Sequence, residues 1–163
     1  GDTASIGGVR VVVWHPSAVD WERQRVRNDD SVVVELCFGD VSIVLPGDIE
    51  ASAESAVAER LPPSPIRILQ APHHGSATSS TLPLIRAARP SLVVVSAGRG
   101  NRYGHPHRAV LDRYRAEGVP VMRTDRDGAI TVRTDGRTAR VVSFTGRRVV
   151  LGPGRDGDRI RRP

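Results

Sequence analysis

Three short apolar runs, each followed by a segment of helical pattern, constrain the fold of this chain more than any other feature. The runs occupy residues 41–45, 66–70 and 92–95, and the helical segments occupy residues 49–61, 82–88 and 107–117. The run at 92–95 is apolar throughout, which is typical of a strand whose sheet is covered on both faces. Because strands that alternate with helices build a sheet layered by helices, the sequence predicts the α/β class.

Further strands flank this alternating region on both sides. We expect them over residues 9–13, 31–38, 119–123, 129–133 and 138–144. Gly39-Asp40 joins 31–38 to 41–45 in a β-hairpin. Residues 18–30 are polar with no sustained apolar period, and we expect a loop there. We assign residues 1–145 to one domain and residues 146–163, rich in Arg and Gly, to a flexible tail.

The composition is that of a globular chain. It has 163 residues, 39% of them hydrophobic and 26% charged. No apolar run approaches the roughly 20 residues of a membrane-spanning helix, and the first residues do not resemble a signal peptide. The chain opens on Gly1 close to a strand, as we expect for a piece of a longer protein. The single cysteine, Cys37, lies in an alternating apolar run and is interpreted as a buried strand thiol.

All 24 basic residues are arginine, and the formal net charge is +6. Arginine guanidinium groups match phosphate oxygens, so the charge is compatible with a polyanion such as DNA. A GC-rich genome that encodes Arg in place of Lys would produce the same composition with solvated surface charges. Charge alone does not decide between these interpretations.

Side chains of the types that bind metal ions follow two of the predicted strands. Asp48 comes after 41–45, with Gly47 allowing a sharp turn, and the pair His73-His74 comes after 66–70. Ligands of α/β proteins gather at the carboxyl ends of strands, where a carboxylate and a neutral imidazole could share zinc, manganese or iron. Each feature has an alternative: a Gly-Asp turn that begins a helix, and a solvated loop that holds two histidines.

A third polar cluster spans residues 101–107, immediately before a predicted helix. It offers the guanidinium group of Arg102, the phenol of Tyr103 and the imidazoles of His105 and His107, which suit an anionic substrate at a helix N-terminus. The alternative is a capped loop in which His107 is simply solvated. His15 and the turn at 124–128 are interpreted as structural.

Five segments, taken in order, resemble the ComEC-type DNA-internalisation competence proteins. They are Asn28-Asp29-Asp30-Ser31-Val32-Val33-Val34, Leu45-Pro46-Gly47-Asp48-Ile49-Glu50, Leu69-Gln70-Ala71-Pro72-His73-His74-Gly75-Ser76, Asn101-Arg102-Tyr103-Gly104-His105-Pro106 and Arg123-Thr124-Asp125-Arg126-Asp127-Gly128-Ala129-Ile130. The resemblance covers roughly residues 8–145. It implies the C-terminal metallo-β-lactamase-like domain of a membrane protein that imports single-stranded DNA.

This resemblance implies a fold and a set of site residues. The fold is an αββα sandwich with two divalent metal ions, zinc or manganese, at one edge of its sheets. Asp48 matches the carboxylate that bridges the two metals, and His74 matches a terminal ligand. His73 and His105 match catalytic groups or groups that touch the phosphate or the ligands. Ser76, Arg102 and Tyr103 match substrate-binding positions. The implied activity is hydrolysis of phosphodiesters in the DNA strand that is not imported.

The chain departs from this pattern in one respect. The His- and Asp-rich signature that supplies most metal ligands in the first half of such domains does not occur here. We therefore expect only the C-terminal half of the sandwich, with exposed sheet surface through which copies could associate. We also expect weak or no metal binding and little activity, because Asp48 and one histidine fall short of the three or four ligands of a tight site.

The partners and alternatives follow from the same resemblance. We expect DNA, as a single strand or a duplex end, and the rest of the parent membrane protein as partners, and no small-molecule cofactor. The parent would reside in the cell membrane, with this domain soluble on the extracytoplasmic side. The alternatives are a non-catalytic DNA-binding or assembly module that uses the arginines, and a hydrolase of another phosphoester such as a phospholipid headgroup.

Overall fold

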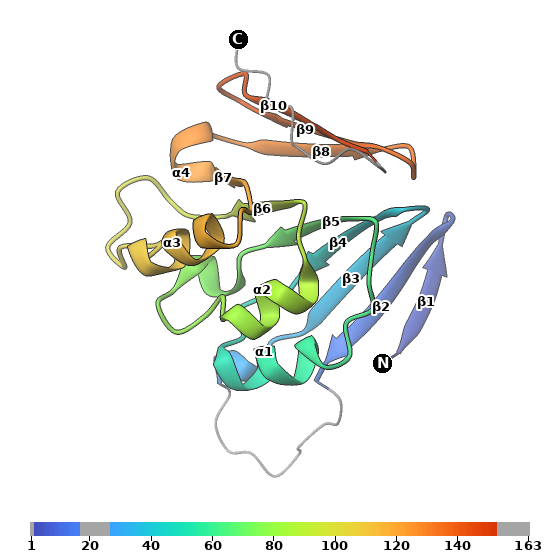
Figure 1. Cartoon of the computed structure of the whole chain (residues 1–163), viewed down its shortest axis with the longest axis horizontal. Helices are drawn as coiled ribbons and strands as arrows, with labels where there is room; N and C mark the ends of the chain where they lie inside the picture. Colours follow the sequence, from blue (N-terminus) through green and yellow to red (C-terminus); the bar gives the residue numbers. More distant parts are fainter. Residues whose placement is uncertain (1, 17–26, 153–163) are drawn as a thin grey trace.

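A computed structural model describes residues 2–16 and 27–152, which form two sheets and one layer of helices (Figure 1). The larger sheet has seven strands in sequential order. They are β1 (Thr3–Ile6), β2 (Val9–His15), β3 (Val33–Phe38), β4 (Val41–Leu45), β5 (Ile66–Gln70), β6 (Leu92–Val95) and β7 (Val121–Arg123). The first four strands pair antiparallel, with tight turns between β1 and β2 and between β3 and β4, whereas β4 to β7 pair parallel.

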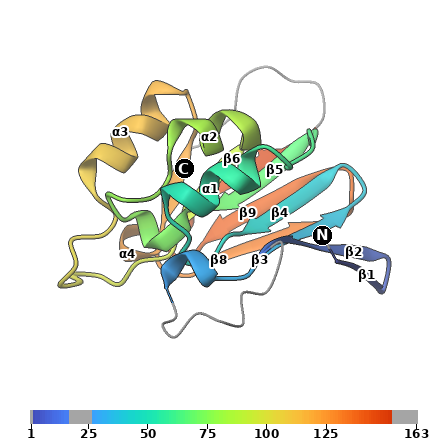
Figure 2. The ribbon, with the colours of Figure 1, turned by 90° about the horizontal axis from the view of Figure 1, so that it is seen from below.

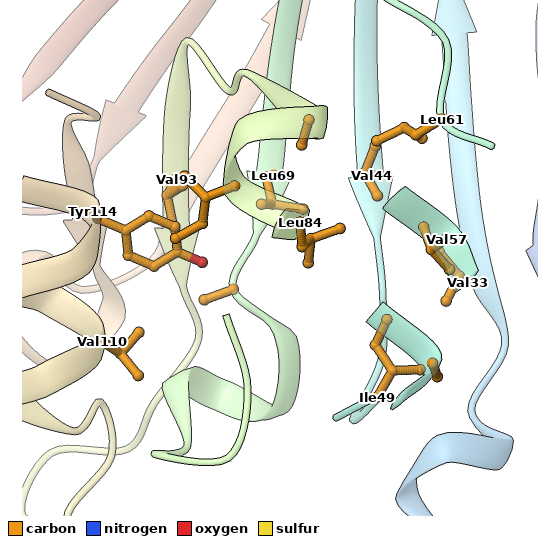
Figure 3. Packing of buried hydrophobic residues seen from close by; sticks show 14 of the residues in the cluster. Val33, Val44, Ile49, Val57, Leu61, Leu69, Leu84, Val93, Val110 and Tyr114 are labelled. Carbon is orange, nitrogen blue, oxygen red and sulfur yellow. The ribbon is translucent and has the colours of Figure 1, made fainter. Parts of the chain in front are cut away.

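Helices connect the parallel strands and cover one face of the large sheet. They are α1 (Ala51–Ala58), α2 (Leu82–Ala88) and α3 (Arg108–Ala116). Three further short helical turns are η1 (Asn28–Asp30), η2 (Pro72–Gly75) and α4 (Thr124–Asp127). Sheet residues such as Val44, Leu69 and Val93 pack against helix residues such as Leu84 and Tyr114 (Figure 3). Burial of each large side chain stabilises this interface by about 1.5–3 kcal/mol.

A second, three-stranded sheet covers the opposite face. It has the order β10 (Arg148–Leu151), β9 (Ala139–Ser143) and β8 (Ile130–Thr134), all antiparallel. A separate core lies between the sheets, where Ile66, Ile68 and Leu92 meet Val141 and Val149. The described residues thus form three layers, of helices, large sheet and small sheet. The mixed α/β class predicted from the sequence is confirmed, and the four-layer αββα sandwich stays a prediction.

The small sheet leaves the β1 end of the large sheet uncovered. Figure 2 shows β1 and β2 projecting beyond the rest of the sheet, and within the described residues the core between the sheets contains no residue of β1, β2 or β3. Ile6 on β1 is 70% exposed and Phe38 on β3 is 38% exposed. Association of copies through this surface stays a prediction.

Several predicted boundaries change. The helix predicted over 49–61 is shorter, at Ala51–Ala58, and the turn at 124–128 contains the single helical turn α4. Strand β1 was not predicted. The tail predicted over 146–163 begins too early, because Arg148–Leu151 pairs with β9 and buries Val149 and Leu151. Most of the loop predicted over 18–30 and residues 153–163 of the tail lie outside the described residues.

A buried ion pair ties β3 to β5 beneath the helices. The guanidinium Nη2 of Arg67 lies 3.0 Å from Glu35 Oε1, and both side chains are almost fully buried. Arg67 also donates to the carbonyl oxygens of Ala88 and Pro62 and to the Ser42 hydroxyl. The indole of Trp14 donates to the second oxygen of Glu35. This network satisfies two charges that would otherwise be costly to bury.

No helix among the described residues is long and apolar enough to cross a bilayer.

Candidate functional site

Asp48 and His74 meet at the carboxyl ends of the neighbouring parallel strands β4 and β5. Asp48 follows Gly47, which has a φ of +62°, and a Cβ added to Gly47 would lie only 2.9 Å from Ser31 Cβ. The Asp48 amide donates to the Ser31 hydroxyl over 3.2 Å. His74 lies in η2, and its Nε2 is 3.5 Å from Asp48 Oδ1. The structure therefore brings together the two residues that the resemblance assigns to the metal.

The orientation of His74 leaves Nε2 free to accept. Its Nδ1 lies 2.8 Å from the carbonyl oxygen of Ser96, which can only accept, so Nδ1 carries the proton. In neutral His74 the Nε2 lone pair then faces the Asp48 carboxylate. A hydrogen bond from the second ring nitrogen to a carbonyl is the usual arrangement of a metal-binding histidine. Two such acceptors repel each other unless a cation, either a proton or a metal ion, lies between them.

The separation of these two atoms fits a shared metal ion. Ligand atoms about 2.1 Å from a tetrahedral metal lie about 3.4 Å from each other, close to the 3.5 Å observed. Both side chains are nearly half exposed, so the position is open to a further ligand. Within residues 2–16 and 27–152, however, no three His, Cys, Asp or Glu side chains are grouped so that they could hold a metal ion. Asp48 and His74 thus fit one part of a metal centre.

His73 points to a different carboxylate. Its Nδ1 is 3.2 Å from Glu50 Oε1, an ion-pair distance without hydrogen-bond geometry. Glu50 accepts from the Thr78 hydroxyl over 2.8 Å and from the Asn28 amide over 3.3 Å. The hydrogen bond from Thr78 lowers the pKa of Glu50 below its usual value. The pairing of Glu50 with His73 was not predicted, because the two residues come from different loops.

Residues 71–81, which connect β5 to α2, are called the histidine loop, and the backbone of this loop is strained at its histidines. His73, His74 and Gly75 have successive φ values of +47°, +55° and +80°, and the left-handed region costs a residue with a Cβ about 1–2 kcal/mol. Hydrogen bonds from the loop and its surroundings hold this conformation. The Ser79 hydroxyl donates to the Pro72 carbonyl, and the His107 amide donates to the Gly75 carbonyl. Strain that the surrounding structure supports in this way is characteristic of functional sites.

A buried carboxylate fixes the far end of the same loop. Glu54 on α1 is fully buried and accepts from the backbone amides of Ser80 and Thr81. Burial raises the pKa of Glu54 above its ordinary value, although these hydrogen bonds oppose the shift. Ser76, predicted to bind substrate, is itself buried, and its hydroxyl pairs with that of Thr78. Ser76 is therefore engaged within the loop and does not line the cavity described next.

A cavity of about 430 Å³ adjoins His74. Its lining consists of His74, Ser96, Ala97, Gly98, Asn101, Tyr103, His105 and Thr124. The Asn101 side chain holds His105 in place, accepting from its amide over 2.9 Å and donating to its carbonyl over 2.7 Å. The cavity therefore joins the histidine loop to the polar cluster that precedes α3.

His105 contributes its imidazole to this cavity. Burial lowers the pKa of His105 below its ordinary value, and the nearby His73 lowers it further. Its ring meets that of His73 edge to face, with centroids 5.7 Å apart. Its Nδ1 is buried and has no hydrogen-bond partner among the described residues. An unpaired buried nitrogen beside a cavity is suited to a polar ligand.

The remaining candidates divide between the cavity and the scaffold. Tyr103 lines the cavity. Arg102 is exposed and is not part of the lining, but its side chain donates a hydrogen bond to the Tyr103 hydroxyl. His107 is the N-cap of α3 and accepts from the Ala109 amide, so its position is explained by the helix. His15 contacts the carbonyl oxygen of Asp29 over 2.6 Å, in line with a structural role.

The chain is similar to a segment of several competence proteins. It is 34% identical to ComE operon protein 3 of Bacillus subtilis over 137 residues, which cover 84% of this chain and 17% of that protein. It is 33% identical to competence protein ComA of Neisseria gonorrhoeae over 125 residues, 72% of this chain and 18% of that protein. It is 35% identical to recombination protein 2 of Haemophilus influenzae over 108 residues, 66% of this chain and 14% of that protein.

These similarities support the competence class predicted from the sequence. The chain spans less than one fifth of the length of each of these relatives. No model of a known protein family matches the chain.

Proposed function

We propose that this chain is part of a metal-dependent hydrolase domain in a DNA-uptake protein, and that the domain cleaves phosphodiesters of the DNA strand that is not imported. The names of the similar competence proteins support the DNA-uptake role. The observation that supports metal-dependent chemistry is the approach of His74 Nε2 to Asp48 Oδ1, at the separation of two ligands of one ion, while His74 Nδ1 is held by the Ser96 carbonyl oxygen.

Each residue of the site would have a distinct role. Asp48 and His74 would hold one side of a divalent metal centre, zinc or manganese, which when bound supplies Lewis acidity toward the phosphate and activates water. His105, whose Nδ1 is unpaired, would donate a hydrogen bond to a phosphate oxygen in the adjoining cavity. Further ligands would come from the parent polypeptide. The isolated chain would therefore bind metal weakly and hydrolyse DNA slowly.

A second function has its own support. The two metal-binding side chains are too few for a tight site among the described residues, and the chain carries an excess of arginine with a net charge of +6. A non-catalytic module that binds DNA or assembles the parent protein would have these properties.

Single substitutions in the parent protein distinguish the two functions. Asp48→Asn and His74→Gln each remove a ligand, and His107→Gln is the matched control because this histidine only caps α3. We expect manganese- or zinc-stimulated cleavage of labelled DNA to fall by at least about 100-fold in the first two variants and to persist in the control. Absence of metal-stimulated cleavage in the unsubstituted parent, with DNA binding equal in every variant, would support the module instead.

A further inference from the structure

An aromatic ring stands at the edge of the cavity without being buried by the fold. Tyr103 is 66% exposed, yet it lines the same cavity as His74 and His105. The other tyrosine, Tyr114, is fully buried in the core. Packing therefore does not explain the presence of a large ring at position 103.

The ring belongs to an ordered stack. The Arg102 guanidinium carbon lies 4.9 Å from the centre of the Tyr103 ring, and Arg102 Nη2 donates to the Tyr103 hydroxyl over 2.8 Å. The rings of Tyr103 and His105 lie within 18° of parallel, with centroids 5.9 Å apart. His105 is in turn fixed by Asn101. Much of the entropy cost of ordering Tyr103 on ligand binding is therefore already met.

The chemistry of this stack suits a particular ligand. Aromatic rings and guanidinium planes are the surfaces on which unpaired bases stack, and such stacking tolerates any sequence because every base has a π face. Arg102 has no ion pair with a carboxylate in the described part of the chain, so its charge is available to a phosphate. A paired base inside a duplex does not offer its face.

We propose that Tyr103, supported by Arg102 and His105, is a stacking platform for an unpaired nucleobase of a DNA strand that enters the cavity. This inference rests on the proposed function, because it identifies single-stranded DNA as the form in which the substrate is bound. A base on Tyr103 is joined through one sugar to its own phosphate, which would then lie over the histidines that line the same cavity.

The test measures stacking directly and without metal. A short oligothymidine strand containing one 2-aminopurine is titrated with protein in EDTA, and both anisotropy and 2-aminopurine fluorescence are recorded. We compare Tyr103→Ala, Tyr103→Phe and Phe144→Ala, the last being a control at an 85% exposed aromatic residue that does not line the cavity. Because position 103 is exposed, no variant is expected to unfold, and circular dichroism checks this.

We expect Tyr103→Ala to bind the strand about tenfold more weakly and to lose the fluorescence quenching, since stacking contributes roughly 1–3 kcal/mol per base. Tyr103→Phe and Phe144→Ala should bind within about twofold of the unsubstituted chain. Equal affinity and quenching in Tyr103→Ala and the unsubstituted chain would overturn the proposal, as would no binding of the strand by the unsubstituted chain. The proposal would also be overturned if Tyr103→Ala weakened binding of a duplex or of an abasic strand as much as it weakens binding of the single strand. Because EDTA removes metal, the assay measures binding alone. The stacking proposal can therefore hold even if the domain has no nuclease activity.

Discussion

Gly75 is the position at which the histidine loop packs against the segment that leads into α3, and its replacement by alanine should disturb both. Its φ of +80° is unfavourable for alanine, at a cost of about 1–2 kcal/mol. An added Cβ would lie 2.7 Å from Pro106 Cβ and 3.2 Å from Pro106 Cα. Overlap in a packed region costs a further 1–3 kcal/mol or so. We therefore expect Gly75→Ala to lower the free energy of unfolding by about 2–5 kcal/mol.

Gly118→Ala is the control that carries the backbone part of this effect without the steric part. Gly118 has a similar φ of +69°, but an added Cβ there would meet no atom within 4 Å, so we expect only the backbone cost of about 1–2 kcal/mol. Urea denaturation followed by circular dichroism gives both values. With a slope of about 1–3 kcal/mol per M, the two midpoints should differ by roughly 1 M. If Gly75→Ala is no less stable than Gly118→Ala, the inference that Gly75 packs closely against Pro106 is wrong.

Two further predictions concern the buried charges. Arg67→Met leaves the Glu35 carboxylate buried with Trp14 as its remaining side-chain donor, so the free energy of unfolding should fall by about 3–5 kcal/mol. Adding Glu35→Leu removes the unpaired charge and should restore part of this loss. A double variant less stable than Arg67→Met would refute this account. Burial raises the pKa of Glu54, so its stabilising contribution is present at low pH and is lost as pH rises through the folded-state pKa. Unfolding of the native chain and of Glu54→Gln, measured upward from about pH 4.5, should therefore show the native chain losing stability relative to the variant, and a gain would be contradictory.

The parts of the fold that follow from local pattern were predictable. Residues 41–45, 66–70 and 92–95 form strands with the predicted bounds because each is a short apolar run closed by turn residues. The meeting of Asp48 with the histidine loop also follows, since β4 and β5 are neighbours and parallel. The choice of His74 as the partner of Asp48 came from the family resemblance and agrees with the observed distance.

The parts that depend on distant contacts were not predictable. Strand β10 lies in a segment rich in Gly and Arg, and it forms because Val149 and Leu151 bury against the large sheet. Strand β1 is exposed along its length, so no alternating pattern marks it. The pairing of His73 with Glu50 and the stacking of Tyr103 on His105 require a three-dimensional arrangement that spacing along the chain does not encode.

The central claim is that Asp48 and His74 converge on one metal ion, and paramagnetic broadening by manganese tests it most directly. Imidazole resonances of the five histidines are followed by NMR as Mn²⁺ is added to the chain. We predict that His74 broadens well before His107, and that Asp48→Asn raises the Mn²⁺ concentration needed for this by about tenfold or more. Equal broadening of His74 and His107, or no effect of Asp48→Asn, would contradict the claim.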